Sequence, residues 1–106
     1  MIKNILTIGL FDKNSEKQEI TTPQAKEIIS KILINDFDIF AFTMMDCNGV
    51  YKMSSTNNIV CEPSIRVEIA TNEIIPEIDG IIEALKTALN QESIMHELAT
   101  AEIYFK

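Results

Sequence analysis

The sequence predicts an α+β fold of the ferredoxin-like type, a βαββαβ sandwich in which one antiparallel sheet carries two helices on one face. Segments with strand-like alternation and segments with helical spacing follow one another in the order strand, helix, strand, strand, helix, strand. The 106 residues contain no internal repeat, linker or low-complexity stretch, so we expect one domain, residues 1–106. The alternative is a different α+β sandwich with an extra hairpin after residue 12.

The spacing of apolar residues changes from alternation in the first strand to helical spacing in the first helix. Residues 4–11 alternate between apolar faces, which predicts a strand with at least one buried side. Thr22 can cap a helix, and Pro23 fits its first turn, where no amide hydrogen bond is needed. The helix is expected to end near Asn35. Its apolar stripe consists of Ala25, Ile28, Ile29, Ile32 and Leu33.

The middle of the chain predicts a hairpin. Residues 39–45 are strongly apolar and indicate a strand, and Asn48-Gly49 after them can form a tight turn or mark a bulge. The bulge is favoured, because Ser54–Asn58 is a better turn cluster, from which residues 59–70 would return antiparallel. Pro63 in this returning strand indicates an edge position or an irregularity. The strand at residues 39–45 is expected to turn Phe40, Phe42 and Met44 toward the core.

A second helix and a last extended segment complete the pattern. Asn72 can cap this helix, and Pro76 is tolerable in its first turn. Residues 94–105 predict a final strand with a break near Ala99-Thr100. The apolar stripe of the helix consists of Ile78, Ile81, Ile82, Leu85, Ala88 and Leu89.

The charge excludes two classes of partner. The net charge is −7, and Arg66 is the only arginine, so no cluster of basic residues could hold a phosphate backbone or an anionic membrane. We therefore expect no direct nucleic-acid binding and no membrane binding. The acidic surface either serves a basic partner or keeps the protein soluble. No apolar stretch resembles a signal core or a membrane span, so the cytoplasm is the expected location.

The residue content also argues against nucleotide and metal chemistry. Only Gly9, Gly49 and Gly80 are present, too far apart for a phosphate loop or a dinucleotide fingerprint. Two cysteines and one histidine supply neither a zinc site nor a catalytic triad. We therefore expect no cofactor and no metal, and a binding protein is favoured over an enzyme.

The densest polar grouping lies in the segment 61–69. Strand periodicity places Arg66 and Glu68 on one face, and a guanidinium group can hold a carboxylate or a phosphate with two parallel bonds. Glu62 or Glu68 could act as a general base if desolvated. The alternative is a cross-strand ion pair between Arg66 and a carboxylate such as that of Asp46.

Two further side chains are candidates for the same site. Tyr51 could supply a hydroxyl group to a pocket, or its ring could pack at the sheet margin. His96, the only histidine, could move protons in an enzyme or simply lie on the surface. The predicted binding residues are Arg66, Glu68, Glu62, Tyr51 and His96.

The ferredoxin-like fold leaves one face of the sheet uncovered, and this predicts an interface. Several residues expected on that face are small or apolar, and such patches often mark contacts between subunits. We therefore expect a homo-oligomer, with a monomer of mixed surface as the alternative. The residues concerned are Thr7, Gly9, Ala41, Thr43 and Met45.

Four segments carry a resemblance that spans nearly the whole chain: residues 7–13, 49–51, 62–69 and 88–93. In these segments the sequence resembles small uncharacterised proteins of Gram-positive gut bacteria and their mobile elements. The resemblance implies no established activity. It implies a protein carried by phages or plasmids, and such proteins often block host defences by binding an effector or its signal molecule.

The predicted function is therefore that of a small acidic binding protein without catalysis, which binds a host protein or a small anionic ligand. One alternative is a cofactor-independent enzyme of the isomerase or monooxygenase type, with a cleft near Arg66. Another alternative is a structural subunit of a homo-oligomeric assembly.

Overall fold

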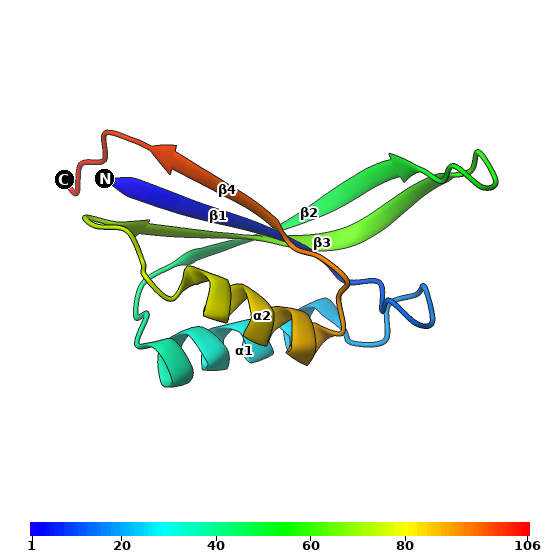
Figure 1. Ribbon diagram of the computed structural model, residues 1–106, viewed down its shortest axis with the longest axis horizontal. Helices are drawn as coiled ribbons and strands as arrows, with labels where there is room; N and C mark the ends of the chain where they lie inside the picture. Colours follow the sequence, from blue (N-terminus) through cyan, green and yellow to red (C-terminus); the bar gives the residue numbers. More distant parts are fainter.

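The computed structural model describes residues 1–106 as one antiparallel sheet with two helices. Its elements are β1 (Ile2–Gly9), α1 (Thr22–Lys31), β2 (Thr43–Lys52), β3 (Ile59–Thr71), α2 (Ile78–Leu89) and β4 (Met95–Thr100), and a π-helical turn at Ile32–Asp36 extends α1. The strand order is β2-β3-β1-β4, and all neighbouring strands are antiparallel. Both helices cover one face of the sheet (Figure 1). The predicted ferredoxin-like class is confirmed.

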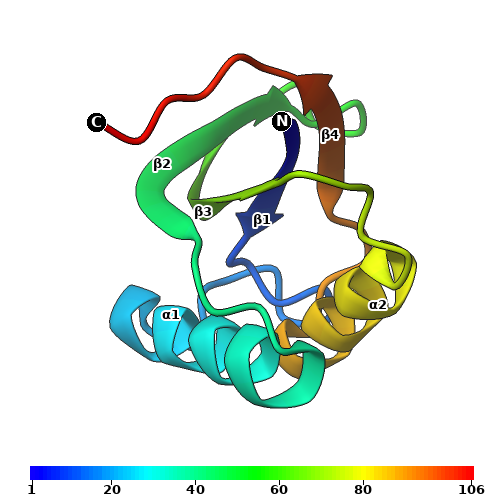
Figure 2. The ribbon, with the colours of Figure 1, turned by 90° about the vertical axis from the view of Figure 1, so that its left-hand side faces the viewer.

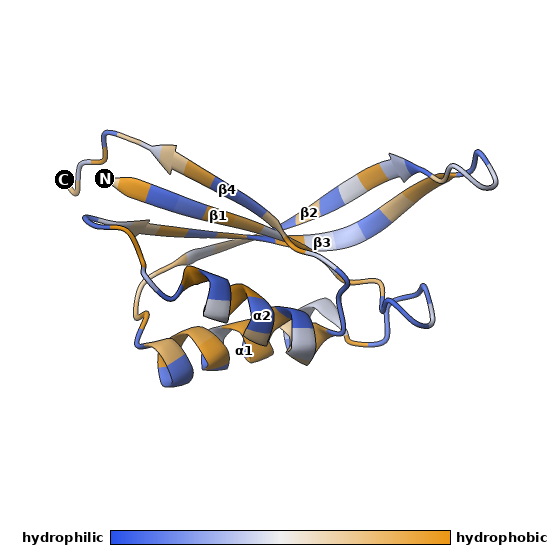
Figure 3. Cartoon of the chain, in the orientation of Figure 1, coloured by the Kyte–Doolittle hydropathy of each residue, from blue (hydrophilic) through white to orange (hydrophobic).

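The core lies between the helices and the two central strands. Hydrophilic and hydrophobic residues alternate along the strands (Figure 3), so that each strand turns one apolar face to the helices. The helices contribute apolar stripes, which close the core from the other side. Thirteen buried residues form the core: Leu6, Ile8, Leu10, Ala25, Ile29, Leu33, Ile65, Val67, Ile69, Ile75, Ile81, Leu85 and Leu89.

The cap of α1 is Thr21, and the predicted cap Thr22 is wrong by one residue. The Thr21 hydroxyl accepts a hydrogen bond from the Gln24 amide at 3.2 Å, and the Gln24 side chain accepts one from the Thr21 amide at 3.0 Å. This reciprocal capping box requires Glu or Gln three residues after the cap. Thr22 has no such partner, and its hydroxyl accepts a hydrogen bond from the Gln18 side chain instead.

The second helix begins later than predicted, and Asn72 does not cap it. Glu77 precedes the first helical residue, Ile78, and provides no side-chain cap. Pro76 disfavours the helical conformation in the residue before it, so the helix is not expected to include Ile75. At the other end Asn90 closes α2 in the left-handed conformation, with φ of 49°.

The predicted bulge at Asn48-Gly49 is wrong, although the strand does continue through these residues as expected. Asn48 pairs with Pro63 and Gly49 with Glu62, in an unbroken register that runs from Thr43 to Lys52. No glycine has positive φ, so neither a left-handed bulge nor a tight turn forms here.

The start of this strand also differs from the prediction. Residues 39–42 have no regular structure, and β2 begins only at Thr43. Phe42 and Met44 pack against the core as expected, but the side chain of Phe40 is 75% exposed. Phe40 lies in the irregular segment before β2, so strand alternation does not turn its side chain toward the core.

Pro63 is tolerated in the central strand β3 because of where β1 ends. The last pair between the two strands is Gly9 with Ser64, and beyond it the Leu10 amide donates to the Pro63 carbonyl at 2.9 Å. The carbonyl and amide positions of one strand residue point the same way, so the nitrogen of Pro63 faces Leu10, just beyond the end of β1, and no donor toward β2 is lost. Pro63 thus lies where β3 passes the end of β1, a local edge of the sheet within a central strand.

The C-terminal segment lies across one end of the uncovered sheet face. Figure 2 shows it leaving β4 and running toward β2. β4 ends at Thr100, close to the predicted break, and reciprocal hydrogen bonds join Ala101 to Met1 at 2.8 and 2.9 Å. Neither helix is long and apolar enough to cross a membrane.

Truncation of Leu85 tests the core. Leu85 is completely buried, so Leu85→Ala should lower the free energy of unfolding by about 2–5 kcal/mol, because it removes apolar contacts and leaves a cavity. Urea denaturation followed by circular dichroism measures the change. Ile59→Ala is the matched control, since Ile59 is 76% exposed, and its effect should stay within about 0.5 kcal/mol. Equal effects of both variants would contradict the assigned core.

Candidate functional site

A cavity of about 280 Å³ lies at the end of the sheet from which the β2–β3 hairpin projects. Figure 1 shows this hairpin and the loop that follows β1 at the same end of the molecule. Three separate parts of the chain form the walls: this loop, the hairpin, and the connection between α2 and β4. The lining residues are Phe11, Asp12, Lys13, Glu16, Tyr51, Met53, Val60, Gln91, Glu92 and Ser93.

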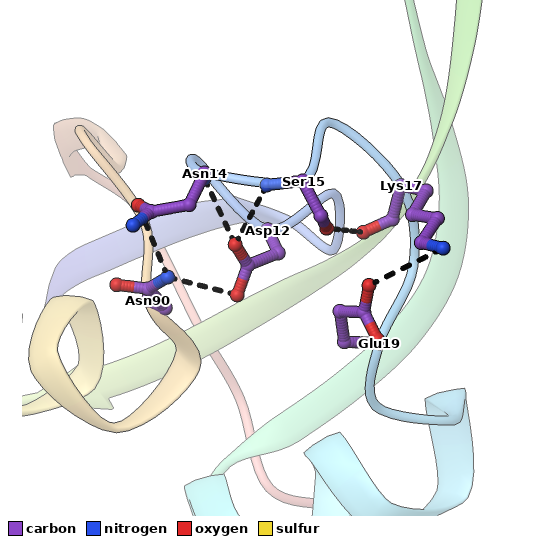
Figure 4. Close-up of polar contacts among 6 residues, drawn as sticks. All are labelled: Asp12, Asn14, Ser15, Lys17, Glu19 and Asn90. Atoms are coloured by element: carbon purple, nitrogen blue, oxygen red, sulfur yellow. Dashed lines mark hydrogen bonds and ion pairs between the residues drawn. The ribbon is translucent and has the colours of Figure 1, made fainter.

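Asp12 organises the loop wall of the cavity (Figure 4). Its Oδ1 accepts hydrogen bonds from the backbone amides of Asn14 at 2.8 Å and Ser15 at 3.1 Å, as in an Asx turn. Its Oδ2 accepts a hydrogen bond from Asn90 Nδ2 at 2.8 Å. The Asn90 bond first, and then the two backbone bonds, hold the pKa of Asp12 below its usual value. The carboxylate is therefore charged and occupied by its own loop.

Two residues at the end of α2 fasten the same loop. The Asn90 carbonyl accepts a hydrogen bond from the Lys13 amide at 3.0 Å. Gln91 is only 8% exposed, and its Nε2 donates to the Phe11 carbonyl at 2.8 Å. Residues that are far apart in sequence thus fix one wall of the cavity before any ligand arrives, which lowers the entropy cost of binding.

Glu62 lies beside this wall. Its half-buried carboxylate accepts a hydrogen bond from the Phe11 amide at 2.8 Å. Burial, followed by the negative charges of Glu62 and Glu16, raises the pKa of Tyr51 above its ordinary value. Tyr51 therefore remains a neutral phenol at physiological pH, able to donate a hydrogen bond.

The cavity combines negative charge with aromatic and apolar surface. Its lining contains three carboxylates, from Asp12, Glu16 and Glu92, against the single ammonium group of Lys13. Four lining residues are apolar or aromatic: Phe11 and Tyr51, whose rings are flat, and Met53 and Val60. Such a site fits a ligand that joins a flat ring to a positive charge.

Arg66 and Glu68 occupy a different place, in the middle of the uncovered sheet face. Glu68 contacts Lys3 at 3.1 Å and Arg66 at 3.4 Å, and the hydrogen bond from Lys3 is the main cause of its lowered pKa. The Nε of Arg66 is buried and has no partner. Asp46 does not pair with Arg66, as the alternative supposed, but with Lys26. Arg66 does not line the cavity at the hairpin.

His96 is separated from the other candidate residues. Its Nε2 is 2.8 Å from Oδ1 of Asn4, which is 2% exposed. The register pairs His96 with the core residue Leu6, so its side chain is on the helical side of the sheet. Of the five predicted residues, only Tyr51 lines the cavity, and Glu62 lies next to it, joined to the amide of the lining residue Phe11.

Sequence reasoning missed the loop residues of the cavity. Asp12 and Asn90 were not among the predicted site residues, and nothing in their spacing along the sequence connects them. No group of three or more His, Cys, Asp or Glu side chains is placed to hold a metal ion.

Known proteins resemble this chain in structure and not in overall sequence. No family model and no curated protein matches the sequence. Among solved structures, the chain is similar to a phage SAM lyase in complex with S-methyl-5′-thioadenosine, with a TM-score of 0.66 and 16% identity over 92% of this chain and 79% of that one. It is also similar to a phage SAM lyase in the apo state, with a TM-score of 0.54 and 22% identity over 98% of this chain and 92% of that one. At this level of identity the likeness establishes the fold.

Removal of the Asn90 side chain tests how the loop is held. Asn90→Gly keeps a residue that favours the left-handed conformation but deletes the hydrogen bond to Asp12, so the pKa of Asp12 should rise toward its usual value. A lowered pKa contributes stability above the unfolded pKa, and this contribution is lost as pH falls through the folded pKa. The variant should therefore lose less stability than the parent on acidification.

Carboxyl ¹³C chemical shifts followed from pH 2 to 7 would measure this pKa. Ser15→Ala is the control, because the Ser15 backbone amide still binds Asp12 and only a 3.5 Å contact to the Lys17 carbonyl is lost. An Asp12 titration that is the same in Asn90→Gly and the parent would contradict the role assigned to Asn90.

Proposed function

We propose that this protein binds S-adenosylmethionine in the cavity at the hairpin and cleaves it, with release of S-methyl-5′-thioadenosine. The observation that carries the proposal is the coincidence of an acidic, aromatic-lined cavity with a fold similar to that of the phage SAM lyases. The proposal replaces the predicted anionic ligand with a cationic one, and it favours the enzymatic alternative with its centre at Tyr51 and Glu62 instead of Arg66.

The charge of the ligand supports this assignment. S-adenosylmethionine carries a sulfonium and an ammonium group against one carboxylate, and the cavity carries an excess of carboxylates. The rings of Phe11 and Tyr51 offer flat surfaces against which an adenine can stack. A negatively charged cleft also attracts the cation from a distance, an effect that salt weakens.

The chemistry requires little from the protein. The carboxylate of the ligand can attack its own γ-carbon, forming a C–O bond while the C–S bond breaks and its electron pair goes to sulfur. The products are the neutral thioether S-methyl-5′-thioadenosine and a lactone that keeps the ammonium group, and no proton moves. The protein needs only to hold the ligand in the bent conformation that this attack requires. The absence of a catalytic triad is compatible with such a reaction.

The charge change at sulfur indicates where Glu62 would act. Sulfur is positive in the substrate and neutral in the product, so a carboxylate beside it would stabilise the ground state more than the transition state. The ammonium group keeps its charge throughout. A productive Glu62 carboxylate therefore holds the ammonium group, while the neutral Tyr51 hydroxyl orients the ligand by a hydrogen bond.

This activity would explain how the protein could block host defences, the role that the sequence resemblance implied. A mobile-element protein in the host cytoplasm that consumes S-adenosylmethionine would deprive any defence that needs this molecule as methyl donor or signal. Antagonism would then act through a small molecule and not through capture of a host protein.

Substitution of Glu62 tests the proposed reaction. The purified protein should convert S-adenosylmethionine to S-methyl-5′-thioadenosine, and Glu62→Gln should lower kcat/KM by about 10- to 100-fold through loss of a charge-assisted bond. Chromatographic separation of the nucleosides measures both. Glu27→Gln, which removes a carboxylate from the Lys31 ion pair on α1, is the control and should leave the rate unchanged. Absence of both cleavage and binding at millimolar ligand would refute the proposed function.

We further propose that the uncovered sheet face contacts a second copy of the chain. Large apolar residues on and around this face are exposed, with Met45 at 40%, Met95 at 67% and Phe105 at 86%. The register places Met45 beside Arg66 and Met95 beside Thr7, so both lie on the open face. The unpartnered Nε of Arg66 supports the same interface, since rearrangement on association could give it a carboxylate acceptor.

Analytical ultracentrifugation tests this interface. The parent should sediment as an oligomer at micromolar concentration, and Met45→Glu should dissociate it, because a charge would be buried in an apolar contact. Ile59→Glu is the control, since Ile59 is even more exposed, at 76%, but lies near the hairpin tip. A monomeric parent at high micromolar concentration would contradict the interface.

A further inference from the structure

We propose that Gly9 is a positioning residue for the candidate site, because its missing side chain provides the space in which the Glu62 carboxylate rests. This inference rests on the proposed function for its activity readout, while its structural part can be tested without any ligand.

The space over Gly9 is filled by the whole carboxyl group of Glu62. A β-carbon built on Gly9 would lie 2.4 Å from Oε2, 2.6 Å from Cδ and 2.7 Å from Oε1 of Glu62. Real β-carbons do not approach other atoms so closely, so any side chain at position 9 must displace this carboxylate. The glycine therefore serves close approach, and its backbone conformation does not require it, since its φ is not positive.

The carboxylate is held in this space from one side. The Phe11 amide donates to Oε2 at 2.8 Å, two residues after Gly9 on the same chain segment. The backbone beneath is fixed by the pairing of Gly9 with Ser64 and by the bond from the Leu10 amide to the Pro63 carbonyl. One strand end thus supplies both the space and the donor that orient Glu62.

The same geometry predicts that a small side chain at position 9 would leave the fold intact. All three clashing atoms belong to the far end of a flexible side chain and none to the backbone. Rotation of Glu62 about its side-chain bonds relieves the clash without moving β1 or β3. The expected consequence is loss of the Glu62–Phe11 bond, with the carboxylate displaced from the ligand group it would hold.

The test compares two glycine-to-alanine variants with Glu62→Gln. Gly9→Ala should weaken S-adenosylmethionine binding, measured by calorimetry, by about 10- to 100-fold, as should Glu62→Gln. The double variant should lose little more than either single variant, because both remove the same contact. Gly80→Ala is the matched control, since its new β-carbon would meet only Phe37 at an ordinary 3.7 Å. Gly80→Ala should bind the ligand like the parent.

A second measurement needs no ligand. Tyr104→Phe leaves Tyr51 as the only tyrosine in a chain without tryptophan, so phenol ionisation can be followed by ultraviolet absorbance. In this background, Glu62→Gln should lower the pKa of Tyr51 by removing a nearby negative charge. Gly9→Ala should also shift the titration midpoint, because the charge moves, whereas Gly80→Ala should leave it in place.

The outcomes separate the two proposals. A shifted Tyr51 midpoint in folded Gly9→Ala supports the role of Gly9 even if the parent neither binds nor cleaves S-adenosylmethionine, in which case only the proposed function fails. An unchanged midpoint in Gly9→Ala would overturn the inference. Parent-like binding by Gly9→Ala, in an assay where Glu62→Gln loses affinity, would overturn it as well.

Discussion

The antiparallel pairing of β1 with β3 is the interaction on which the rest of the structure depends. Its register places Leu6 opposite Val67 and Ile8 opposite Ile65, which brings the apolar faces of both central strands under the helices. A shift by one residue would turn these side chains to the uncovered face and expose the core. The same register aligns Gly9 with Ser64 and brings the end of β1 to Glu62.

The candidate site is built just beyond this pairing, where the strands stop sharing hydrogen bonds. The chain leaves β1 after Gly9, turns around Asp12 and is hydrogen-bonded to Asn90 and Gln91 at the end of α2. The hairpin of β2 and β3 extends past β1 and adds Tyr51 to the opposite wall. A rigid sheet with ligand groups on the loops at its end is a common way to position a binding site.

Carboxylates dominate the charge of the candidate site. The carboxylates of Asp12 and Glu62 both accept hydrogen bonds from backbone amides, so the protein itself holds them in place. Their field, added to that of Glu16 and Glu92, favours cations at this end of the molecule. On the sheet face Lys3 and Arg66 both contact Glu68, so an anion that binds there would have to compete with two existing ion pairs.

The sequence by itself determined the fold class, because apolar periodicity is a local property: the alternation in residues 4–11 and 59–70 and the helical stripes of α1 and α2 require a two-layer α+β arrangement. It also placed Tyr51 and Glu62 among the candidate residues. Helix starts and the supposed bulge were misplaced, since Thr21, Pro76 and Gly49 act through partners that the pattern does not reveal. Only the tertiary structure joined Phe11 to Glu62 and Asp12 to Asn90, because hydrogen bonds between residues 51 and 78 positions apart depend on strand register and helix docking.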